Sequence, residues 1–332
     1  MPTINIVPAD ALACGYYRLK QQADLLFTAR KEVVVSPPGH FNTFNPDVFY
    51  TQRICSQKVL PLMRQLKEST GAEIIIDYDD LTWLYQNQSV PEYNWCSEKL
   101  DVLGNTAAME AHLNEVADKI TVSTEEIKKS LLQFVPEEKI TVIPNMLSYK
   151  EWGFEMPKSA PAEDIFYYAG SDTHFSNDKK MLGDFSSGLA KFLSNKKIVC
   201  KATVPWFLSP QKMYAPSPLS RYARDFYSET RECKFILAPL ADNVFNRCKS
   251  HLKYLESCAV GRVCLVSSFD GCPYEGAHEY QKIPVGSTAK AIKYIVDRAS
   301  ENYVEILNWQ YQYLAQHWLD NNMKIYTDLL GI

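Results

Sequence analysis

The chain has 332 residues, 46% of them hydrophobic, and its formal net charge at pH 7 is −4. A chain of this length and composition can bury a sizeable core, and the length favours two domains over one. The acidic balance excludes an overall positive field that would draw the molecule onto nucleic acid or anionic lipid, although it leaves room for a local basic patch.

Nine cysteines are scattered along the chain without a Cys-x-x-Cys pair or a Cys/His spacing typical of a metal site. Because the chain is too large to need disulfides, we expect reduced thiols and a cytoplasmic location. The N-terminal residues resemble a strand, not a basic region followed by a long apolar run. We therefore expect no signal peptide, lipid anchor or membrane span.

Alternating strand and helix patterns begin at the N-terminus. A β-branched run over 3–7 is followed by a glycine turn and by a helical pattern over 19–26. Gly15 at such a turn would let a ligand approach the backbone, and Arg18 in the first helical turn would reach an anion. A tight turn with an exposed arginine is the competing interpretation.

A buried strand over 74–76 ends in three aspartates, Asp77, Asp79 and Asp80. Carboxylates at this end of a buried strand lie where open α/β sheets bind ligands. Crowding raises the pKa of at least one of them, which suits a general base, so the three aspartates are the candidate catalytic residues. A divalent cation site and a helix N-cap with solvated aspartates are the alternatives.

A proline-containing linker over 149–161 precedes a second set of strands and helices. After a strand over 164–169, Gly170, Ser171 and His174 lie in a polar loop that would present backbone amides to an anion. The spacing is not that of a Walker A loop, and no Gly-x-Gly-x-x-Gly occurs in the chain. Kinase, ATPase and dehydrogenase functions therefore lose their main support.

The stretch from Phe245 to Ser267 combines a basic loop, a short helix, a glycine and a buried strand. This order would bring Arg247, Lys249 and the first amides of the helix together, which suits a phosphate. A surface helix with ordinary basic residues is the alternative. Apolar residues from Val304 to Trp318 then predict a long packing helix. The whole pattern predicts an α/β fold with two Rossmann-like halves of parallel sheet, tied together by the C-terminal helix.

In their order along the chain, these motifs resemble the GT-B glycosyltransferases of the glycosyltransferase family 4 type, especially compact members encoded by bacteriophages. The resemblance spans most of the chain. The residues that carry it are Cys14-Gly-Tyr-Tyr-Arg18, Asp77-Tyr-Asp-Asp80 with Val90-Pro-Glu-Tyr-Asn94, Ala117-Asp-Lys-Ile-Thr-Val-Ser-Thr124, Ile143-Pro-Asn145, Tyr168-Ala-Gly-Ser-Asp-Thr-His174 and Lys249-Ser-His-Leu-Lys-Tyr-Leu-Glu256.

The resemblance implies an acceptor-binding domain over 1–155, a nucleotide-sugar-binding domain over 156–302 and a helical segment over 303–332 that packs across both, with the two sheets facing a cleft. Glu256 matches the family's glutamate that accepts hydrogen bonds from the ribose hydroxyls. Lys249 and Ser250, with Arg247 or Lys253, match the groups that hold the diphosphate. The expected donor-binding set is completed by Gly15, Arg18, Gly170, Ser171 and His174.

One departure concerns the sugar. The wider family has two glutamates eight residues apart, and Cys248 stands where the first is expected. The identity of the sugar is therefore not carried over. The implied activity is transfer from a UDP-sugar to a hydroxyl acceptor with retention of configuration. The nucleotide sugar is the co-substrate, and no bound metal or other cofactor is expected.

The leading expectation for the acceptor is a hydroxymethylpyrimidine base in phage DNA, modified in the host cytoplasm. Aromatic stretches over 83–85 and 93–95 would support a flipped base, whereas the acidic net charge argues against DNA. The alternatives are a saccharide or a lipid-linked glycan, and a nucleotide-sugar-binding protein that has lost catalysis, which the cysteine at 248 motivates.

Overall fold

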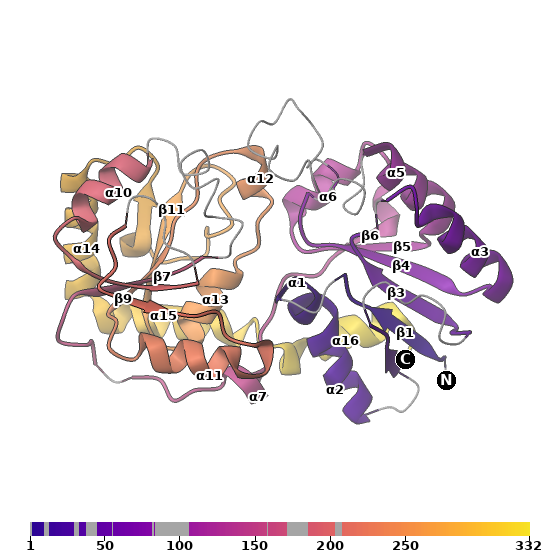
Figure 1. Ribbon diagram of the computed structural model, residues 1–332, viewed down its shortest axis with the longest axis horizontal. Coiled ribbons are helices and arrows are strands. Elements are labelled where there is room, and N and C mark those ends of the chain that lie inside the picture. The colour runs from indigo at the N-terminus through magenta and orange to yellow at the C-terminus, as the bar shows by residue number, and fades with distance from the viewer. Residues whose placement is uncertain are drawn as a thin grey trace. The chain divides into compact units, whose positions relative to one another are not determined.

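The computed structural model describes residues 2–9, 13–29, 33–37, 45–54, 56–81, 83, 106–157, 159–170, 185–202 and 208–332. These fall into two compact units (Figure 1). The N-terminal unit comprises Met1–Met146, Cys248–Ser250 and Leu319–Ile332, and the C-terminal unit comprises Leu147–Arg247 and His251–Trp318. The short segment Cys248–Ser250 thus packs with the N-terminal unit, although its neighbours in sequence belong to the C-terminal unit.

The N-terminal unit is built on a parallel six-stranded sheet with the strand order β2-β1-β3-β4-β5-β6. The chain passes from β1 to β2 in one direction and then crosses to β3 on the other side of β1. This reversal creates a switch point, and ligands of open α/β sheets bind outside the carboxyl ends of the strands near such a point. The strands are β1 (Ile4–Val7), β2 (Val33–Val35), β3 (Val48–Gln52), β4 (Glu73–Tyr78), β5 (Lys119–Val122) and β6 (Ile140–Val142).

Helices surround this sheet because its central strands are apolar on both faces. Ile74, Ile75 and Ile76 of β4 are each fully buried, as expected for a strand covered on both sides. The helices are α1 (Ala13–Gly15), the π-helix η1 (Tyr16–Lys20), α2 (Gln21–Ala29), α3 (Leu60–Thr70), α5 (Thr106–Ala111), the π-helix η4 (His112–Val116), α6 (Glu125–Leu131), the short 3₁₀-helix η5 (Glu137–Lys139) and α16 (Leu319–Leu330). Thr124 caps α6 by accepting a hydrogen bond from the Ile127 amide at 3.2 Å.

The C-terminal unit repeats the architecture with the strand order β12-β11-β10-β7-β8-β9, again entirely parallel. Numbered within the unit, this is the 3-2-1-4-5-6 order of the dinucleotide-binding fold, with its switch point between β7 and β10. The strands are β7 (Ile165–Ala169), β8 (Lys197–Lys201), β9 (Lys212–Tyr214), β10 (Phe235–Ala238), β11 (Val263–Ser268) and β12 (Lys282–Pro284). The helices are α7 (Tyr149–Trp152), α10 (Phe185–Leu193), α11 (Leu219–Thr230), α12 (Val244–Arg247), α13 (Leu252–Ala259), η6 (Glu279–Gln281), α14 (Ala289–Glu301) and α15 (Tyr303–Ala315).

The C-terminal segment forms two helices where the apolar stripe suggests one. α15 ends at Ala315, and the backbone then pairs with Leu147, whose amide donates to the His317 carbonyl at 3.1 Å. α16 follows from Leu319 and buries Leu319, Tyr326 and Leu330 in the core of the N-terminal unit. The segment therefore contributes to both units.

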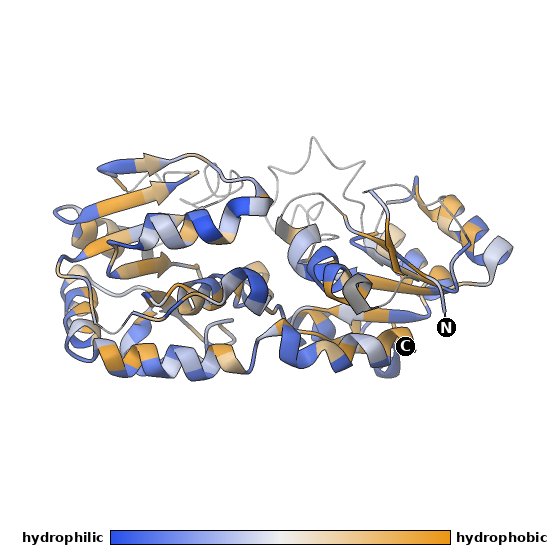
Figure 2. Ribbon diagram, turned by 90° about the horizontal axis from the view of Figure 1, so that it is seen from below, coloured by the Kyte–Doolittle hydropathy of each residue, from blue (hydrophilic) through white to orange (hydrophobic). Residues whose placement is uncertain are grey.

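Polar and apolar residues alternate along the helices of both units, as Figure 2 shows. Helices with this pattern bury one face and leave the other in water. Among the described helices, none has the length and apolar character needed to cross a membrane.

Candidate functional site

The three aspartates at the end of β4 each have a different cationic partner. Asp77 is paired with Arg18, Asp79 with Arg53 and Asp80 with Lys249. All six residues belong to the N-terminal unit. Their arrangement divides the predicted catalytic cluster into one fully buried pair and two partly accessible ones.

Arg18 and Asp77 form the buried pair. Arg18 is 1% exposed and Asp77 is 0% exposed. The guanidinium donates to both carboxylate oxygens, from Nη2 at 2.6 Å and from Nε at 3.1 Å. Burial raises the pKa of Asp77, and the guanidinium opposes that rise. Burial would lower the pKa of Arg18, but the carboxylate raises it well above its ordinary value, so the guanidinium stays charged.

Further hydrogen bonds satisfy this pair on every side. The Thr121 hydroxyl on β5 donates to Asp77 Oδ1 at 2.6 Å. Arg18 Nη1 donates to the Ile143 carbonyl at 2.6 Å and to Asn145 Oδ1 at 3.0 Å. A buried charge pair that is bonded to several segments in this way positions those segments, and its burial keeps it away from solvent. This geometry favours a structural role for Arg18 and Asp77 in place of direct ligand contact.

Asn145 connects this network to the stretch predicted to hold phosphate. Its amide Nδ2 donates to the Ser250 hydroxyl at 2.7 Å. The Thr124 hydroxyl donates to the Cys248 carbonyl at 3.3 Å. Motifs that lie more than a hundred residues apart in sequence therefore meet around Cys248–Ser250.

Asp79 and Asp80 lie nearer to solvent. Arg53, the residue after β3, donates to Asp79 from Nε at 2.5 Å and from Nη2 at 2.8 Å. Burial would raise the pKa of Asp79, but the Arg53 guanidinium holds it below its ordinary value. Lys249 Nζ donates to Asp80 Oδ2 at 2.9 Å. The other oxygen of Asp80, Oδ1, is buried and has no hydrogen-bond partner within the described part of the chain.

The remaining predicted residues are placed as follows. Gly15 lies in helical backbone with φ −62°, so the predicted turn at this position is wrong, and its role towards the donor stays a prediction. Gly170 follows directly after β7, at the switch point of the C-terminal sheet. Ser171 and His174 lie outside the described residues.

The predicted donor-binding residues between 247 and 256 lie in different elements and have different partners. Arg247 ends α12 and donates to Asp242 at 2.7 Å, and both side chains are exposed. Lys253 lies in the first turn of α13. Glu256 lies further along α13, is 3% exposed and accepts a hydrogen bond from the Tyr222 hydroxyl at 3.5 Å. Part of the predicted donor set therefore lies on α13, and Lys249 and Ser250 lie in the segment before it.

Cys248 differs chemically from the carboxylate that the resemblance leads one to expect. The residue is 2% exposed. Burial raises the pKa of its thiol to about 12, so the group is neutral near pH 7. It cannot supply the negative charge of a glutamate to a sugar hydroxyl.

Trp83 does not behave as a stacking platform for a base. It is 2% exposed, and its ring packs edge-on against Tyr78 with centroids 5.4 Å apart. The rest of the two aromatic stretches, over 84–85 and 93–95, lies outside the described residues.

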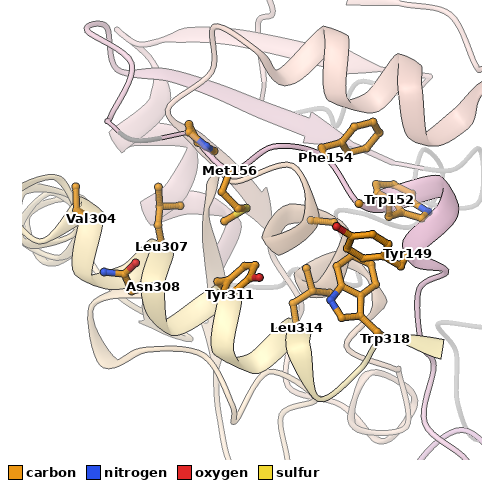
Figure 3. A pocket seen from close by; sticks show the side chains of 13 residues that line it. Tyr149, Trp152, Phe154, Met156, Val304, Leu307, Asn308, Tyr311, Leu314 and Trp318 are labelled. Atoms are coloured by element: carbon orange, nitrogen blue, oxygen red, sulfur yellow. The ribbon is translucent and has the colours of Figure 1, made fainter. Parts of the chain in front are cut away.

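A pocket of about 530 Å³ lies in the C-terminal unit between the segment from Tyr149 to Pro157 and helix α15 (Figure 3). Its lining is dominated by aromatic and aliphatic side chains, among them Trp152, Tyr311 and Trp318. None of the residues predicted to bind donor or acceptor lines it, so this pocket is not the predicted site.

Arg53 is the residue of this site that the sequence patterns miss. A signal was present, since it directly follows a strand that neighbours β4, where an arginine would meet the aspartates at the same sheet edge. Asn145 belongs to a matched motif, but its contacts with Arg18 and Ser250 are not visible in the sequence.

No family model matches the sequence, and a search of curated proteins gives no match either. The fold is similar to that of solved glycosyltransferases. Anabaena Alr3699/HepE in complex with UDP-glucose has a TM-score of 0.64 and 11% identity over 100% of both chains. The lipopolysaccharide outer core galactosyltransferase WaaB has a TM-score of 0.56 and 11% identity over 99% of this chain and 98% of its own. A glycosyltransferase from Rickettsia africae has a TM-score of 0.54 and 11% identity over 98% of each chain. With its two parallel six-stranded sheets, the chain has the two-domain, Rossmann-like GT-B fold of these proteins.

Proposed function

We propose that the protein is a glycosyltransferase that moves a sugar from a UDP-sugar to a hydroxyl group. One observation carries the proposal. Lys249, predicted to hold the donor diphosphate, lies 2.9 Å from Asp80, predicted to act on the acceptor hydroxyl. The residue proposed for the donor and the residue proposed for the acceptor are distant in sequence but are in contact in the structure, and the fold is shared with glycosyltransferases. The UDP-glucose complex of HepE supports a uridine nucleotide as the donor.

The contacts suggest how the chemistry would proceed. The acceptor oxygen bonds to the anomeric carbon, the bond from that carbon to the diphosphate breaks, and UDP leaves with the electron pair. Lys249 and Ser250 supply the positive charge and hydrogen bonding that the leaving diphosphate needs. Asp80 takes the proton of the acceptor hydroxyl. A diphosphate that attracts Lys249 also releases Asp80 from its ion pair.

Protein cations, and not a metal ion, are proposed to neutralise the diphosphate. Asp79 and Asp80 each already have a cationic partner, Arg53 and Lys249. A divalent ion at these aspartates would have to displace both, which supports metal-independent transfer. Retention of the anomeric configuration is proposed from the family resemblance, so the acceptor oxygen must bond on the face of the anomeric carbon from which UDP departs. The NMR coupling constant of the product linkage tests this.

The test separates donor binding from turnover. We expect Lys249→Ala to weaken UDP binding about 10–100-fold, because it removes a charge-assisted contact. We expect Asp80→Asn to lower kcat about 10²–10⁴-fold while UDP affinity changes little. Calorimetric titration with UDP and release of UDP from UDP-glucose measure the two effects. Lys293→Ala, on the exposed face of α14, is the matched control.

Equal loss of UDP affinity in the Lys249 and Asp80 variants would contradict this division of roles. Failure of the wild-type protein to bind any uridine or other nucleoside diphosphate would overturn the proposed function itself.

Two acceptors are proposed. A hydroxymethylpyrimidine in DNA is supported by the resemblance to phage-encoded enzymes. A saccharide or lipid-linked glycan is supported by the net charge of −4 and by the likeness to a lipopolysaccharide galactosyltransferase. Mass spectrometry of hydroxymethylcytosine DNA, hydroxymethyluracil DNA and simple sugars, each incubated with a set of nucleotide sugars, decides between them. Donor binding without transfer or hydrolysis would indicate a nucleotide-sugar-binding protein without catalysis.

A further inference from the structure

Arg53 has an unusual backbone conformation, and it lies at the carboxyl edge of the N-terminal sheet, beside the aspartates that end β4. It follows the last residue of β3 and has φ +55°, in the left-handed region that residues other than glycine seldom adopt. Its amide donates to the carbonyl of Asp77 on the neighbouring strand at 2.8 Å. A conformation of this kind costs on the order of 1 kcal/mol and persists where surrounding contacts determine it.

The side chain of Arg53 reaches both remaining aspartates. Its Nε and Nη2 atoms donate to the two oxygens of Asp79 at 2.5 and 2.8 Å, so the pair is bidentate. The same Nη2 lies 4.0 Å from Asp80 Oδ2. The Arg53 side chain is 16% exposed and that of Asp79 is 8% exposed, so water weakens these contacts little.

These contacts make two adjacent carboxylates unequal. Both oxygens of Asp79 accept hydrogen bonds from the Arg53 guanidinium, and the Gln52 side chain adds a further hydrogen bond to this carboxylate. Asp80 offers Oδ2 to Lys249, and its Oδ1 has no hydrogen-bond partner among the residues that the structure describes. An oxygen that is buried and unbonded in the protein alone can accept a hydrogen bond from a bound hydroxyl.

We propose that Arg53 is a positioning residue for the transfer reaction. It holds both oxygens of Asp79 in hydrogen bonds, and so leaves Asp80 as the carboxylate of the pair that takes the acceptor's proton. This inference rests on the proposed function, because it assigns the roles of groups within that site. Arg53 itself need not touch either substrate.

The first experiment does not depend on turnover. Carbon-detected NMR of protein labelled at the aspartate carboxyls follows Asp79 through a pH titration in the wild type, in Arg53→Gln and in Arg53→Lys. We expect the titration of Asp79 to move upward by about one pH unit or more in Arg53→Gln, since its cationic partner is gone. Arg53→Lys keeps the positive charge but loses the bidentate hydrogen bonds, so it should shift the titration of Asp79 less. Arg64→Gln, which removes a surface arginine paired with Glu115 in the same unit, should leave it in place.

The second experiment measures the reaction, with UDP-glucose as donor and water as acceptor. Arg53→Gln should lower kcat for UDP release about 10–100-fold at unchanged KM and move the acid limb of the pH–rate profile to higher pH, with partial recovery in Arg53→Lys. Asp79→Asn should lower kcat far less than Asp80→Asn. The assignment is overturned if Asp79 titrates identically in Arg53→Gln and the wild type, or if Asp79→Asn costs as much as Asp80→Asn. Absence of UDP release and of UDP binding in the wild type would instead overturn the proposed function, while the titration still tests the Arg53 contact.

Discussion

At the scale of single residues, three neighbouring carboxylates coexist because each has a cation from a different segment. Asp77 has Arg18, Asp79 has Arg53, and Asp80 has Lys249. Crowded aspartates without such partners would repel one another, and one of them would be protonated near neutral pH. Paired, they occupy three distinct environments, of which that of Asp77 is fully buried.

The buried pair gives a stability prediction. Arg18→Met leaves Asp77 charged and unpaired in a site from which water is excluded, so we expect it to destabilise the protein by about 3–5 kcal/mol. Urea unfolding, followed by far-UV circular dichroism, measures this. Arg64→Met, at an exposed pair, is the control and should cost less than about 1 kcal/mol.

The double variant Arg18→Met/Asp77→Asn discriminates the cause. Because it removes the stranded charge, it should be more stable than Arg18→Met alone. A double variant that is less stable than the single one would show that packing, not the unpaired carboxylate, accounts for the loss.

The sequence predicts where the aspartates of this site lie in the fold, but it does not predict which residues pair with each other. The aspartates could be placed because charged residues after an apolar strand must lie at its carboxyl end. Arg18 and Asn145 are 127 positions apart, and their contact depends on how the sheet brings two loops to one edge. No local pattern contains that information, so an arginine predicted to bind an anion proves to be bonded within the protein.

At the scale of elements, apolar runs predict strands well, and helix ends less well. The run over 74–76 lies in β4, and the run over 164–169 is β7 but for one residue. The C-terminal stripe continues past Ala315, but the helix stops there because His317 and Trp318 pair with Leu147, far away in sequence. A tertiary contact overrides local helix propensity at this point.

The turn between α13 and β11 gives an element-scale prediction. Gly261 has φ +63°, and a Cβ built there would lie 2.2 Å from the Pro157 side chain. We expect Gly261→Ala to destabilise the C-terminal unit by about 2–4 kcal/mol, adding overpacking to the backbone cost. Gly286→Ala is the matched control in the same unit, because Gly286 has φ +84° with nothing within 4 Å, and it should cost about 1 kcal/mol.

Urea unfolding of the two glycine variants measures the difference. Equal losses would mean that the backbone conformation alone matters and that Pro157 yields without cost. A larger loss at Gly261 would show that the added methyl group clashes with Pro157, as the 2.2 Å separation predicts.

At the scale of the whole molecule, each unit contains a histidine whose surroundings oppose protonation, fully buried in the N-terminal unit and partly buried in the C-terminal unit. His112 in the N-terminal unit is fully buried, and its Nε2 lies 2.9 Å from the Ser56 carbonyl. His317 in the C-terminal unit has Nδ1 at 2.7 Å from the Tyr313 carbonyl and stacks on the Tyr313 ring. Burial lowers the pKa of both rings. A proton added to His112 would reach Nδ1, which has no hydrogen-bond partner among the described residues.

These shifts predict that acid destabilises both units before the carboxylates titrate. In the unfolded chain each ring takes up a proton near pH 6.5, whereas in the folded protein it resists protonation. The contribution of each neutral ring to the free energy of unfolding is therefore full above about pH 6.5 and falls as the pH drops, by up to about 1.4 kcal/mol per pH unit for each histidine.

Thermal unfolding between pH 7.5 and 5.5 should show Tm falling in the wild type. His112→Gln and His317→Asn keep the N–H donors without the titrating ring, so each should flatten this dependence, and their combination should flatten it most. If Tm of the double variant falls as steeply as that of the wild type over this range, other groups cause the acid sensitivity.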